Sequence, residues 1–582
     1  MKKITFGTPE ELVPSVFCKN FSYNEKAINY DTSRITSVKT KRGFKIELPL
    51  RGDENVYGLG LQLKTINHKY RKLTLRVNAD PVSAAGDSHA PVPFFVTNKG
   101  YGIYFDTARY AEFYCGFRKI TKSANNNPDR EKADVMTSTQ DLYKLRQTTT
   151  ETVMAVEIPA VAGVDIYIIE GDTITDIVAQ YNMLSGGGCD VPDWGLGVLY
   201  RCYSKYTSGE VEAMADYFRD KDIPCDILGL EPGWQSQAYS CSYVWDKGRY
   251  PDPQKTVKYL KDKDFHVNLW EHAFTHPTSP VYMDMADGLS GNYEVWGGVV
   301  PDFALPKTRA KFAAYQKQAL VDIGVDGFKL DECDSSDFTG SWSFPNCAEF
   351  PSGLDGEQYH SLFGTLYMQA IMEALGDTKT LSEVRNAGAL AASYPFALYS
   401  DLYEHRDFIR GVVSSGFSGL LWSPELRHAD SKKDLVRRMQ TVVFSCQCLI
   451  NAWYCEKAPW LAFDCENEVR DLLKLRETLV PMLSLSFAKY KSTGKPPIRA
   501  LVMDYTDDKE TYNIDDQYIF CDDLIVAPLT ASQNSRKVYL PEGEWKDYFT
   551  GEKVKSGWFT VERAEDEIGN IPVYVKCAGT NE

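Results

Sequence analysis

The first 170 residues alternate apolar and polar positions in short runs that are separated by turn residues. Segments such as 44–50 (FKIELPL) and 164–170 (VDIYIIE) show this pattern, which is typical of half-buried strands. We therefore predict an N-terminal antiparallel β-sandwich. A helix capped by Asp172 follows and ends at three consecutive glycines, Gly186–Gly188, so the first predicted domain covers residues 1–185.

From about residue 190 to 485 the pattern changes to short apolar runs that alternate with amphipathic helices. Eight runs qualify as strands: 195–200, 225–230, 266–270, 326–330, 379–384, 396–400, 419–422 and 448–453. Eight strands with helical crossovers predict a (β/α)₈ TIM barrel over residues 186–490. An open doubly wound sheet is the alternative. No G-x-G-x-x-G turn opens a helix after a strand, so a dinucleotide site is not supported.

After a long predicted helix at 469–490, the chain returns to alternating patterns. We predict a small C-terminal β domain over residues 491–582. The expected fold class is therefore α/β: a (β/α)₈ barrel with an N-terminal antiparallel β-sandwich and a small C-terminal β domain.

Charge and composition narrow the possible partners and the cellular compartment. Lys and Arg total 64 and Asp and Glu total 80, so the net charge of −16 disfavours nucleic acids and anionic membranes as partners. The N-terminus lacks the apolar run of a secretory signal, and no stretch reaches the ~18 apolar residues of a membrane span. These features predict a cytoplasmic protein whose 14 cysteines are reduced. The aromatic content of 13% fits either sugar stacking or burial in β cores.

Carboxylates, cations and aromatic residues gather at the ends of the predicted barrel strands. Catalytic side chains in a TIM barrel come from the C-terminal strand ends, so these positions are the candidate site. A run of surface charge would not coincide with strand ends in this way. The candidates are Glu231, Trp234, Trp270, His272, Lys329, Asp331, Arg385, Asp401, Trp422, Glu425 and Arg427.

The fourth strand carries the sharpest signal, in the segment GFKLDECD. Alternation places Lys329 and Asp331 on one face, where the cation can keep the carboxylate ionised, as a nucleophile requires. A structural ion pair is the alternative. Asp401 follows the next strand but one and can face Asp331 across the barrel mouth. Glycoside hydrolysis needs two facing carboxyl groups, one to attack the anomeric carbon and one to transfer the proton. Other carboxylates are also candidates for these two roles.

The order of these motifs resembles that of glycoside hydrolase family 31, whose members are retaining exo-α-glycosidases such as α-glucosidases, α-xylosidases and α-galactosidases. The resemblance spans nearly the whole chain, through Tyr57-Gly58-Leu59-Gly60, Gly327–Asp331, Ser400-Asp401, 521–528 (CDDLIVAP) and 540–545 (LPEGEW). It implies that Asp331 is the nucleophile, Asp401 the acid/base and Glu231 a sugar-binding carboxylate. It also implies substrate-site roles for Trp270, Trp422 and Arg385, and no metal or organic cofactor.

Departures from the family pattern surround the position of the non-reducing sugar. Glu231 replaces the usual Asp, and Glu332-Cys333-Asp334 follows the nucleophile in place of Met-Asn-Glu or Phe-Gly-Glu. Lys-x-Asp at 329–331 resembles the α-xylosidase branch, and also α-galactosidases of neighbouring families. The polar set of Glu231, Lys329, Glu425 and Arg427 favours an α-galactoside or related sugar.

The expected partner is thus an oligosaccharide or glycoside, hydrolysed by double displacement at its terminal α-linked sugar. An α-xyloside or α-glucoside is the alternative substrate, and transglycosylation is a further outcome of the same intermediate. A non-catalytic carbohydrate-binding protein is the alternative from another functional class.

Three further features have both a functional and a structural interpretation. Trp234 either stacks on a sugar ring or fills the barrel top. His272 fits hydrogen bonding to sugar hydroxyls or simple burial, and its spacing from His276 does not predict a metal site, because Pro277 follows directly. The insert at 340–360 either covers the site or is a surface excursion.

Overall fold

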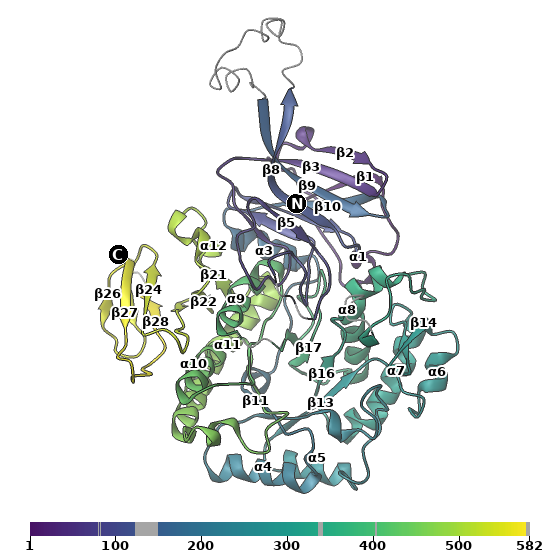
Figure 1. The fold of residues 1–582 in the computed structure, drawn as a ribbon, viewed down its shortest axis with the longest axis vertical. Coiled ribbons are helices and arrows are strands. Elements are labelled where there is room, and N and C mark those ends of the chain that lie inside the picture. The colour runs from purple at the N-terminus through teal and green to yellow at the C-terminus, as the bar shows by residue number, and fades with distance from the viewer. Residues whose placement is uncertain (80, 82, 123–148, 336–340, 402–403, 578–582) are drawn as a thin grey trace, which may run out of the picture.

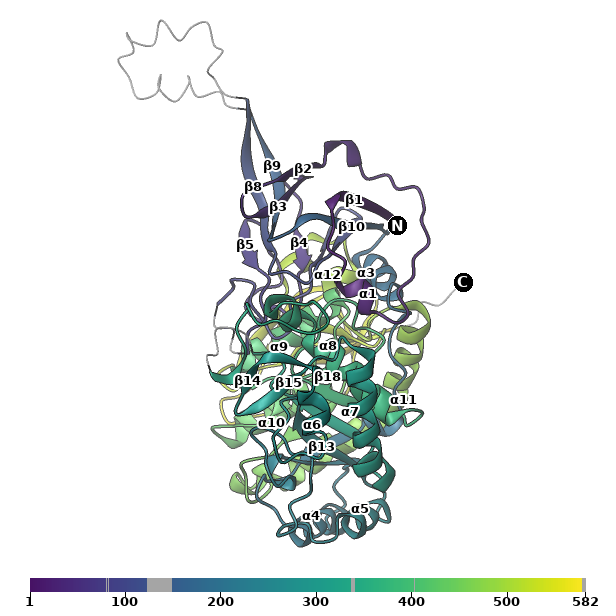
Figure 2. The ribbon, with the colours of Figure 1, turned by 90° about the vertical axis from the view of Figure 1, so that its right-hand side faces the viewer.

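The computed structural model describes residues 1–582 except 80, 82, 123–148, 336–340, 402–403 and 578–582. Figures 1 and 2 show an N-terminal region of strands stacked on the barrel, and Figure 1 shows the C-terminal strands at the side of the barrel. The predicted fold class is confirmed. In the part of the chain that the structure describes, no helix has the length and apolar character needed to cross a bilayer.

Two five-stranded antiparallel sheets form the N-terminal sandwich. One sheet has the order β1 (Lys2–Thr8), β10 (Ala162–Glu170), β7 (Tyr101–Asp106), β6 (Phe94–Thr97) and β4 (Val56–Gly58). The other has the order β2 (Thr36–Lys39), β3 (Gly43–Leu50), β9 (Thr149–Pro159), β8 (Glu112–Lys122) and β5 (Arg71–Thr74). Alternate residues of β3, Phe44, Ile46 and Leu48, are buried between the sheets, as the period of two predicts.

The linking helix α3 (Ile174–Met183) begins one residue later than predicted, because Thr173 and not Asp172 caps it. The Thr173 hydroxyl accepts a hydrogen bond from the backbone N–H of Asp176. The Asp176 carboxylate accepts one from the backbone N–H of Thr173, at 3.0 Å. This reciprocal pair satisfies two N–H groups that the first helical turn leaves without partners.

Eight parallel strands form the barrel sheet, in agreement with the eight predicted runs. Their order is β18 (Phe396–Leu398), β17 (Ser382–Val384), β16 (Gly327–Asp331), β13 (His266–His272), β12 (Ile227–Leu230), β11 (Val198–Arg201), β20 (Cys448–Asn451) and β19 (Glu425–Leu426). The seventh predicted run, at 419–422, does not form a regular strand and contributes only an isolated bridge at Trp422. Leu398 of β18 bonds with Leu421 and Ser423 and so closes the barrel, whereas the regular strand β19 starts further along, at Glu425.

Helices pack around this sheet. The longer ones are α4 (Ser208–Asp220), α5 (Pro253–Lys261), α7 (Pro306–Ala319), α8 (Gly356–Leu375), α9 (His405–Ser415), α10 (Lys432–Val443) and α11 (Glu466–Thr493). Short helices are α1 (Pro14–Phe17), α6 (Tyr282–Ala286) and α12 (Leu501–Asp504). The sequence pattern did not predict the hairpin of β14 (Ser290–Val295) and β15 (Gly298–Pro301), which extends the barrel after β13.

The C-terminal region is a small β domain, as predicted. Its main sheet has the order β21 (Ile498–Ala500), β22 (Tyr518–Phe520), β23 (Leu524–Val526), β28 (Val573–Lys576), β25 (Trp545–Asp547) and β26 (Lys553–Val554). A second, two-stranded sheet pairs β24 (Ser535–Leu540) with β27 (Gly557–Glu562).

One buried carboxyl group lies between the barrel wall and its helices. Glu271 of β13 is fully buried and accepts hydrogen bonds from Tyr367 (2.6 Å) and Gln316 (3.0 Å). Burial raises its pKa to about 8. Because the folded pKa lies above the unfolded value, the folded state holds the proton more tightly. The stability from this group is complete below about pH 4.3 and is lost as pH rises toward 8.

We therefore expect Glu271→Gln to flatten the pH dependence of unfolding. Between pH 5 and 8 the wild type loses up to about 1.4 kcal/mol per pH unit from this one group, and the glutamine variant does not. Urea unfolding of both proteins across this range measures the difference. Glu542→Gln, at an exposed position, is the matched control. Parallel pH curves for wild type and Glu271→Gln would contradict the expectation.

Candidate active site

A pocket of about 270 Å³ opens at the C-terminal ends of the barrel strands. Among the residues that line it are seven of those the sequence predicted: Glu231, Trp270, Lys329, Asp331, Arg385, Asp401 and Arg427. They come from six different strands or strand ends, so the barrel brings together residues up to 196 positions apart in sequence (231 to 427). Charges of both signs converge on a small volume, as is usual in sites that bind and transform polar ligands.

Asp331 ends β16, where two hydrogen-bond donors and one nearby cation surround its carboxylate. Its carboxylate accepts a hydrogen bond from the indole N–H of Trp270 at 2.6 Å and another from the backbone N–H of Glu332 at 2.9 Å. The Nε atom of Arg385 lies 3.8 Å away. The side chain is 15% exposed, so the carboxylate is oriented by the protein and still accessible from the pocket. This is the arrangement that a carboxylate nucleophile requires.

The cation next to this carboxylate is Arg385 and not Lys329, which corrects the expectation from strand alternation. The Lys329 ammonium group lies 3.3 Å from both carboxylate oxygens of Glu231. Glu231 also pairs with the buried Arg201 at 3.1 Å. Lys329 therefore belongs to an ion-pair network at the floor of the pocket, because a buried carboxylate attracts it more closely than Asp331 does.

Asp401 lies between two guanidinium groups. Its Oδ2 atom is 2.8 Å from Nη1 of Arg385, and its Oδ1 atom pairs with Nη1 of Arg427. Burial alone would raise the pKa of this carboxyl, but the positive charges of Arg385 and Arg427 outweigh that effect and hold the pKa below its ordinary value. Arg385 thus contacts both acidic side chains and places Asp331 and Asp401 on the same side of the pocket.

Four predicted substrate residues lie behind the pocket wall. Trp234 is fully buried and its indole N–H donates to the backbone oxygen of Trp270 at 2.7 Å. Trp422 packs against Gly411 of α9, where a β-carbon would come within 2.7 Å of the indole nitrogen. Both tryptophans are buried and neither lines the pocket, so their contacts with substrate stay predictions.

The other two are also enclosed. His272 is fully buried, and burial lowers its pKa to about 3. Glu425 accepts a hydrogen bond from Asn451 at 3.0 Å, and burial together with the charge of Asp401 raises its pKa to about 7. Neither side chain lines the pocket, and their assigned contacts with substrate stay predictions.

Seven lining residues were not among the candidates, although Glu332 was noted as a departure from the family pattern: Ala79, Pro232, Tyr239, Glu332, Ser335, Trp342 and Trp453. Trp453 follows the eighth strand, and the rule of reading strand ends could have found it. Trp342 belongs to the predicted insert at 340–360, so the described part of that insert does reach the site; residue 340 lies outside the described residues. Tyr239 lies in a loop without a pattern, and its ring is 5.5 Å from that of Trp270.

Glu332 has an unusual backbone as well as an acidic side chain in the pocket. Its φ of 56° is in the left-handed region, which non-glycine residues rarely adopt outside functional sites. This turn directs its N–H toward Asp331. Burial and the adjacent charge of Asp331 raise the pKa of the Glu332 carboxyl well above its usual range.

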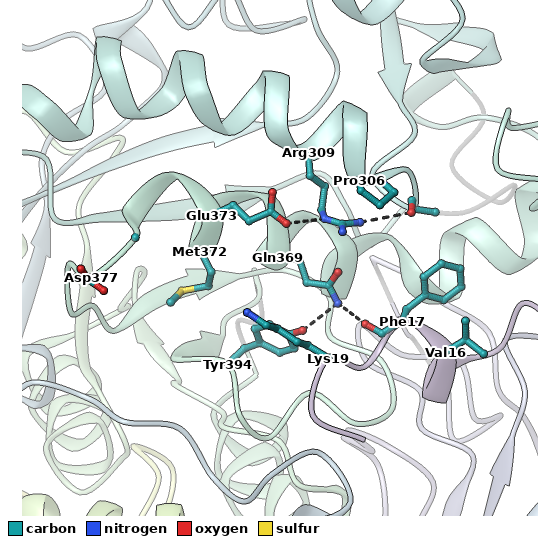
Figure 3. Close-up of a pocket in the computed structure, with 12 residues that line it drawn as sticks. Val16, Phe17, Lys19, Pro306, Arg309, Gln369, Met372, Glu373, Asp377 and Tyr394 are labelled. Atoms are coloured by element: carbon teal, nitrogen blue, oxygen red, sulfur yellow. Dashed lines mark hydrogen bonds and ion pairs between the residues drawn. The ribbon is translucent and has the colours of Figure 1, made fainter. Parts of the chain in front are cut away.

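A larger pocket, of about 860 Å³, lies elsewhere, between the N-terminal segment and helices α7 and α8 (Figure 3). Its central polar groups bond with one another: Arg309 with Glu373 at 2.8 Å, and Gln369 with Tyr394 and the backbone of Phe17. Among the described residues that line this larger pocket, no cation is shared by two carboxylates, whereas Arg385 contacts both Asp331 and Asp401 at the strand ends. The smaller pocket is therefore the candidate active site.

Comparison with known proteins identifies the family of the chain. Profiles described as the N-terminal galactose mutarotase-like domain, the TIM-barrel domain and the C-terminal domain of glycosyl hydrolase family 31 match residues 19–113, 189–484 and 494–579. A structure described as the GH31 dextranase FjDex31A of Flavobacterium johnsoniae, complexed with glucose, has the same fold: TM-score 0.78, 22% identity, 93% of this chain and 67% of that one.

Two curated relatives are similar over much of the chain. An α-xylosidase of Emericella nidulans is 23% identical over 92% of this chain and 68% of its own length. An α-glucosidase of Bacillus thermoamyloliquefaciens is 27% identical over 71% of this chain and 56% of its own length. Because the three domain profiles match in order along most of the sequence, the chain belongs to glycoside hydrolase family 31 and is a glycoside hydrolase.

Proposed function

We propose that the protein is a retaining exo-α-glycosidase in which Asp331 is the nucleophile and Asp401 the acid/base. The observation that carries the proposal is that one guanidinium, that of Arg385, contacts both carboxylates at the mouth of the barrel. Two carboxyl groups that act on the same bond must lie close together. A retaining mechanism expects about 5–5.5 Å between them, and an inverting one requires a wider gap for water.

In the first step, an Asp331 oxygen attacks the anomeric carbon while Asp401 transfers its proton to the glycosidic oxygen. The bond to the leaving group breaks, and a glycosyl ester forms on Asp331. In the second step, Asp401 removes a proton from water, which attacks the anomeric carbon and releases the sugar and the free carboxylate. Trp270 and the N–H of Glu332 orient the nucleophile throughout.

The size and closure of the pocket support action at a chain end. A volume of about 270 Å³ is at the lower limit of small-molecule sites and suits one sugar unit. The ion pair of Glu231 and Lys329 forms the floor and offers hydrogen-bond partners to sugar hydroxyls. Glu332, which favours its protonated form, adds a donor beside the nucleophile.

For the sugar, an α-xyloside or α-glucoside now has better support than the α-galactoside that the polar residues had suggested. The relative named α-xylosidase matches 92% of the chain, and the relative named α-glucosidase 71%. Neither comparison favours galactose. We propose an α-xyloside first and an α-glucoside second, which agrees with the Lys-x-Asp motif at 329–331.

Nitrophenyl α-glycosides of xylose, glucose, galactose, N-acetylgalactosamine and sulfoquinovose test the sugar directly. We expect the highest kcat/KM with the xyloside, and the glucoside next. Activity on the galactoside alone would overturn this order. Analysis of products in the presence of an added acceptor sugar separates hydrolysis from transglycosylation, which shares the glycosyl-Asp331 intermediate.

The two guanidinium groups beside Asp401 predict how the pH profile of activity changes when one of them is removed. Catalysis on an unactivated glycoside needs protonated Asp401, so the limb of kcat/KM that falls with rising pH reports the pKa of this group. Because Arg385 and Arg427 lower that pKa, we expect this limb at acidic pH. Arg427→Gln removes one positive charge, which raises that pKa. We expect the falling limb to move up by about one pH unit or more.

Arg470→Gln is the matched control, because Arg470 pairs with Glu466 on α11 and is not among the residues that line the pocket. It should leave the pH profile of the wild type unchanged. A falling limb that stays in place in Arg427→Gln would contradict the assignment of that limb to Asp401.

A further inference from the structure

A histidine from the N-terminal sandwich reaches the active-site loops of the barrel. His89 lies between β5 and β6 and is fully buried. Its Nδ1 atom is 2.6 Å from a carboxylate oxygen of Asp334, and its Nε2 atom is 2.6 Å from the hydroxyl of Ser400. Asp334 follows the nucleophile by three positions, and Ser400 immediately precedes Asp401.

The chemistry of the partners determines where the ring proton lies. Burial would raise the pKa of Asp334, but Arg385 and His89 outweigh burial and lower it, so the carboxylate is ionised and can only accept hydrogen bonds. Nδ1 of His89 therefore carries the proton. Nε2 and the Ser400 hydroxyl share the second hydrogen bond of the ring, because the hydroxyl can either donate to Nε2 or accept from it.

These contacts close into a ring of interactions around the acid/base. Asp334 also accepts a hydrogen bond from Nε of Arg385 at 2.9 Å, and Nη1 of Arg385 lies 2.8 Å from Asp401. Asp401 is joined to Ser400 by the peptide bond. The path therefore runs from His89 through Asp334, Arg385 and Asp401 to Ser400, and back to His89.

The same three residue types form the triad of serine hydrolases, but burial excludes that chemistry here. Ser400 is 2% exposed and His89 is 0% exposed, so no substrate carbonyl reaches the hydroxyl. Asp401, in contrast, is 42% exposed at its side chain and faces the pocket. The ring therefore supports a group that touches substrate and does not itself touch it.

We propose that His89 is a positioning residue that fixes Asp401 from behind through Ser400, while Asp334 and Arg385 fix it from the front. This inference rests on the proposed role of Asp401 as acid/base. Removing either end of the His89 contact lets the Asp401 backbone shift, and a displacement of about 1 Å of a catalytic group can cost about 100-fold in rate. The hydrogen bonds to the nucleophile come from Trp270 and the N–H of Glu332, which are not members of this ring, although Arg385 of the ring also lies 3.8 Å from Asp331.

Substrates with different leaving groups separate positioning of the acid from a general loss of activity. A dinitrophenolate leaves without a proton, whereas a methyl or sugar alkoxide needs one from Asp401. In Ser400→Ala and His89→Ala we expect kcat/KM for the methyl α-glycoside to fall by about 10- to 100-fold. The dinitrophenyl glycoside of the same sugar should stay within about 3-fold of wild type, because its glycosylation step does not use the acid.

Thermal unfolding shows whether His89→Ala folds. If it folds poorly, Ser400→Ala, which removes only a hydroxyl, still tests the proposal. His68→Gln is the matched control: His68 is a second buried histidine of the same sandwich, and its Nε2 atom lies 3.1 Å from the backbone oxygen of Gly58. It should leave the ratio of the two substrates unchanged.

Asp401→Ala, measured in parallel, distinguishes the two levels of the proposal. If Asp401→Ala lowers both substrates equally, the acid/base assignment fails and the positioning role fails with it. If Asp401→Ala loses activity mainly on the methyl glycoside and Ser400→Ala and His89→Ala do not, only the role of His89 is overturned. If Ser400→Ala and His89→Ala also lose activity mainly on the methyl glycoside, the positioning role of His89 is supported.

Discussion

Asp331→Ala is expected to lower kcat/KM by at least about 10⁴-fold on every glycoside that the wild type hydrolyses, because no ester intermediate can form. The loss should not depend on the leaving group, since the missing atom is the attacking oxygen. Folding should be retained, because Asp331 accepts hydrogen bonds only from groups at the rim of the pocket. Steady-state kinetics and thermal unfolding together check this result.

Trapping provides the independent control. A 2-fluoro glycoside of the preferred sugar with an activated leaving group should add one glycosyl unit to the wild type, and peptide mass spectrometry should locate it on Asp331. Asp430→Asn, at a side chain that is 83% exposed, is the matched variant and should be labelled like the wild type. A labelled peptide that lacks residue 331 would reject the assignment, and no labelling would favour a non-catalytic carbohydrate-binding protein.

Asp401→Ala is expected to have the second largest effect, and an effect that depends on the substrate. Hydrolysis of methyl or disaccharide substrates should fall by about 10²- to 10⁴-fold in kcat/KM, the range attributed to general acid catalysis. Dinitrophenyl glycosides should keep most of their kcat/KM, because their leaving group needs no proton. For them, kcat should fall, since release of the sugar from Asp331 still needs a base.

Azide offers the decisive check on this variant. As a small anion that needs no deprotonation, it should attack the β-linked glycosyl ester on Asp331 from the opposite face. Turnover of the dinitrophenyl substrate should then be restored, and the product should be the α-glycosyl azide. In the wild type, azide should change little. Absence of both rescue and glycosyl azide would argue that another carboxylate, with Glu332 the first to test, performs the acid/base role.

The overall architecture could be predicted from the sequence because the spacing of apolar residues differs between strands and helices. Eight apolar runs separated by amphipathic helices predicted the barrel, and their ends predicted most of the charged lining of the pocket. Asp331, Arg385 and Asp401 were found in this way. Reading the strand ends finds these residues because the residues that follow parallel strands all lie at the same end of the barrel.

The rule does not tell whether a side chain at the rim faces the pocket or the wall. Trp234 and Trp422 follow strands as regularly as Trp270 does, yet both turn into packing spaces beside their neighbours. Lys329 shares a face with Asp331, but its partner, Glu231, comes from another strand. Contacts between side chains on separate strands are set by tertiary packing, which no local pattern encodes.

Loops carried the least sequence signal and still form part of the site. Tyr239 and Trp342 line the pocket from segments without periodicity. The sugar preference inferred from sequence has less support than its alternative, because a list of polar residues does not give their arrangement. Glu425 entered that list as a substrate contact, whereas the structure encloses it beside Asn451.

The N-terminal sandwich contributes Ala79 to the pocket wall and buries His89 against the strand ends. The barrel therefore does not form the pocket by itself. We expect exchange of the sandwich between related enzymes to change the shape of the pocket and, if Asp401 is the proposed acid, its support through His89, even with every barrel residue retained. Recombination or engineering of this protein should treat the two domains as one inherited unit.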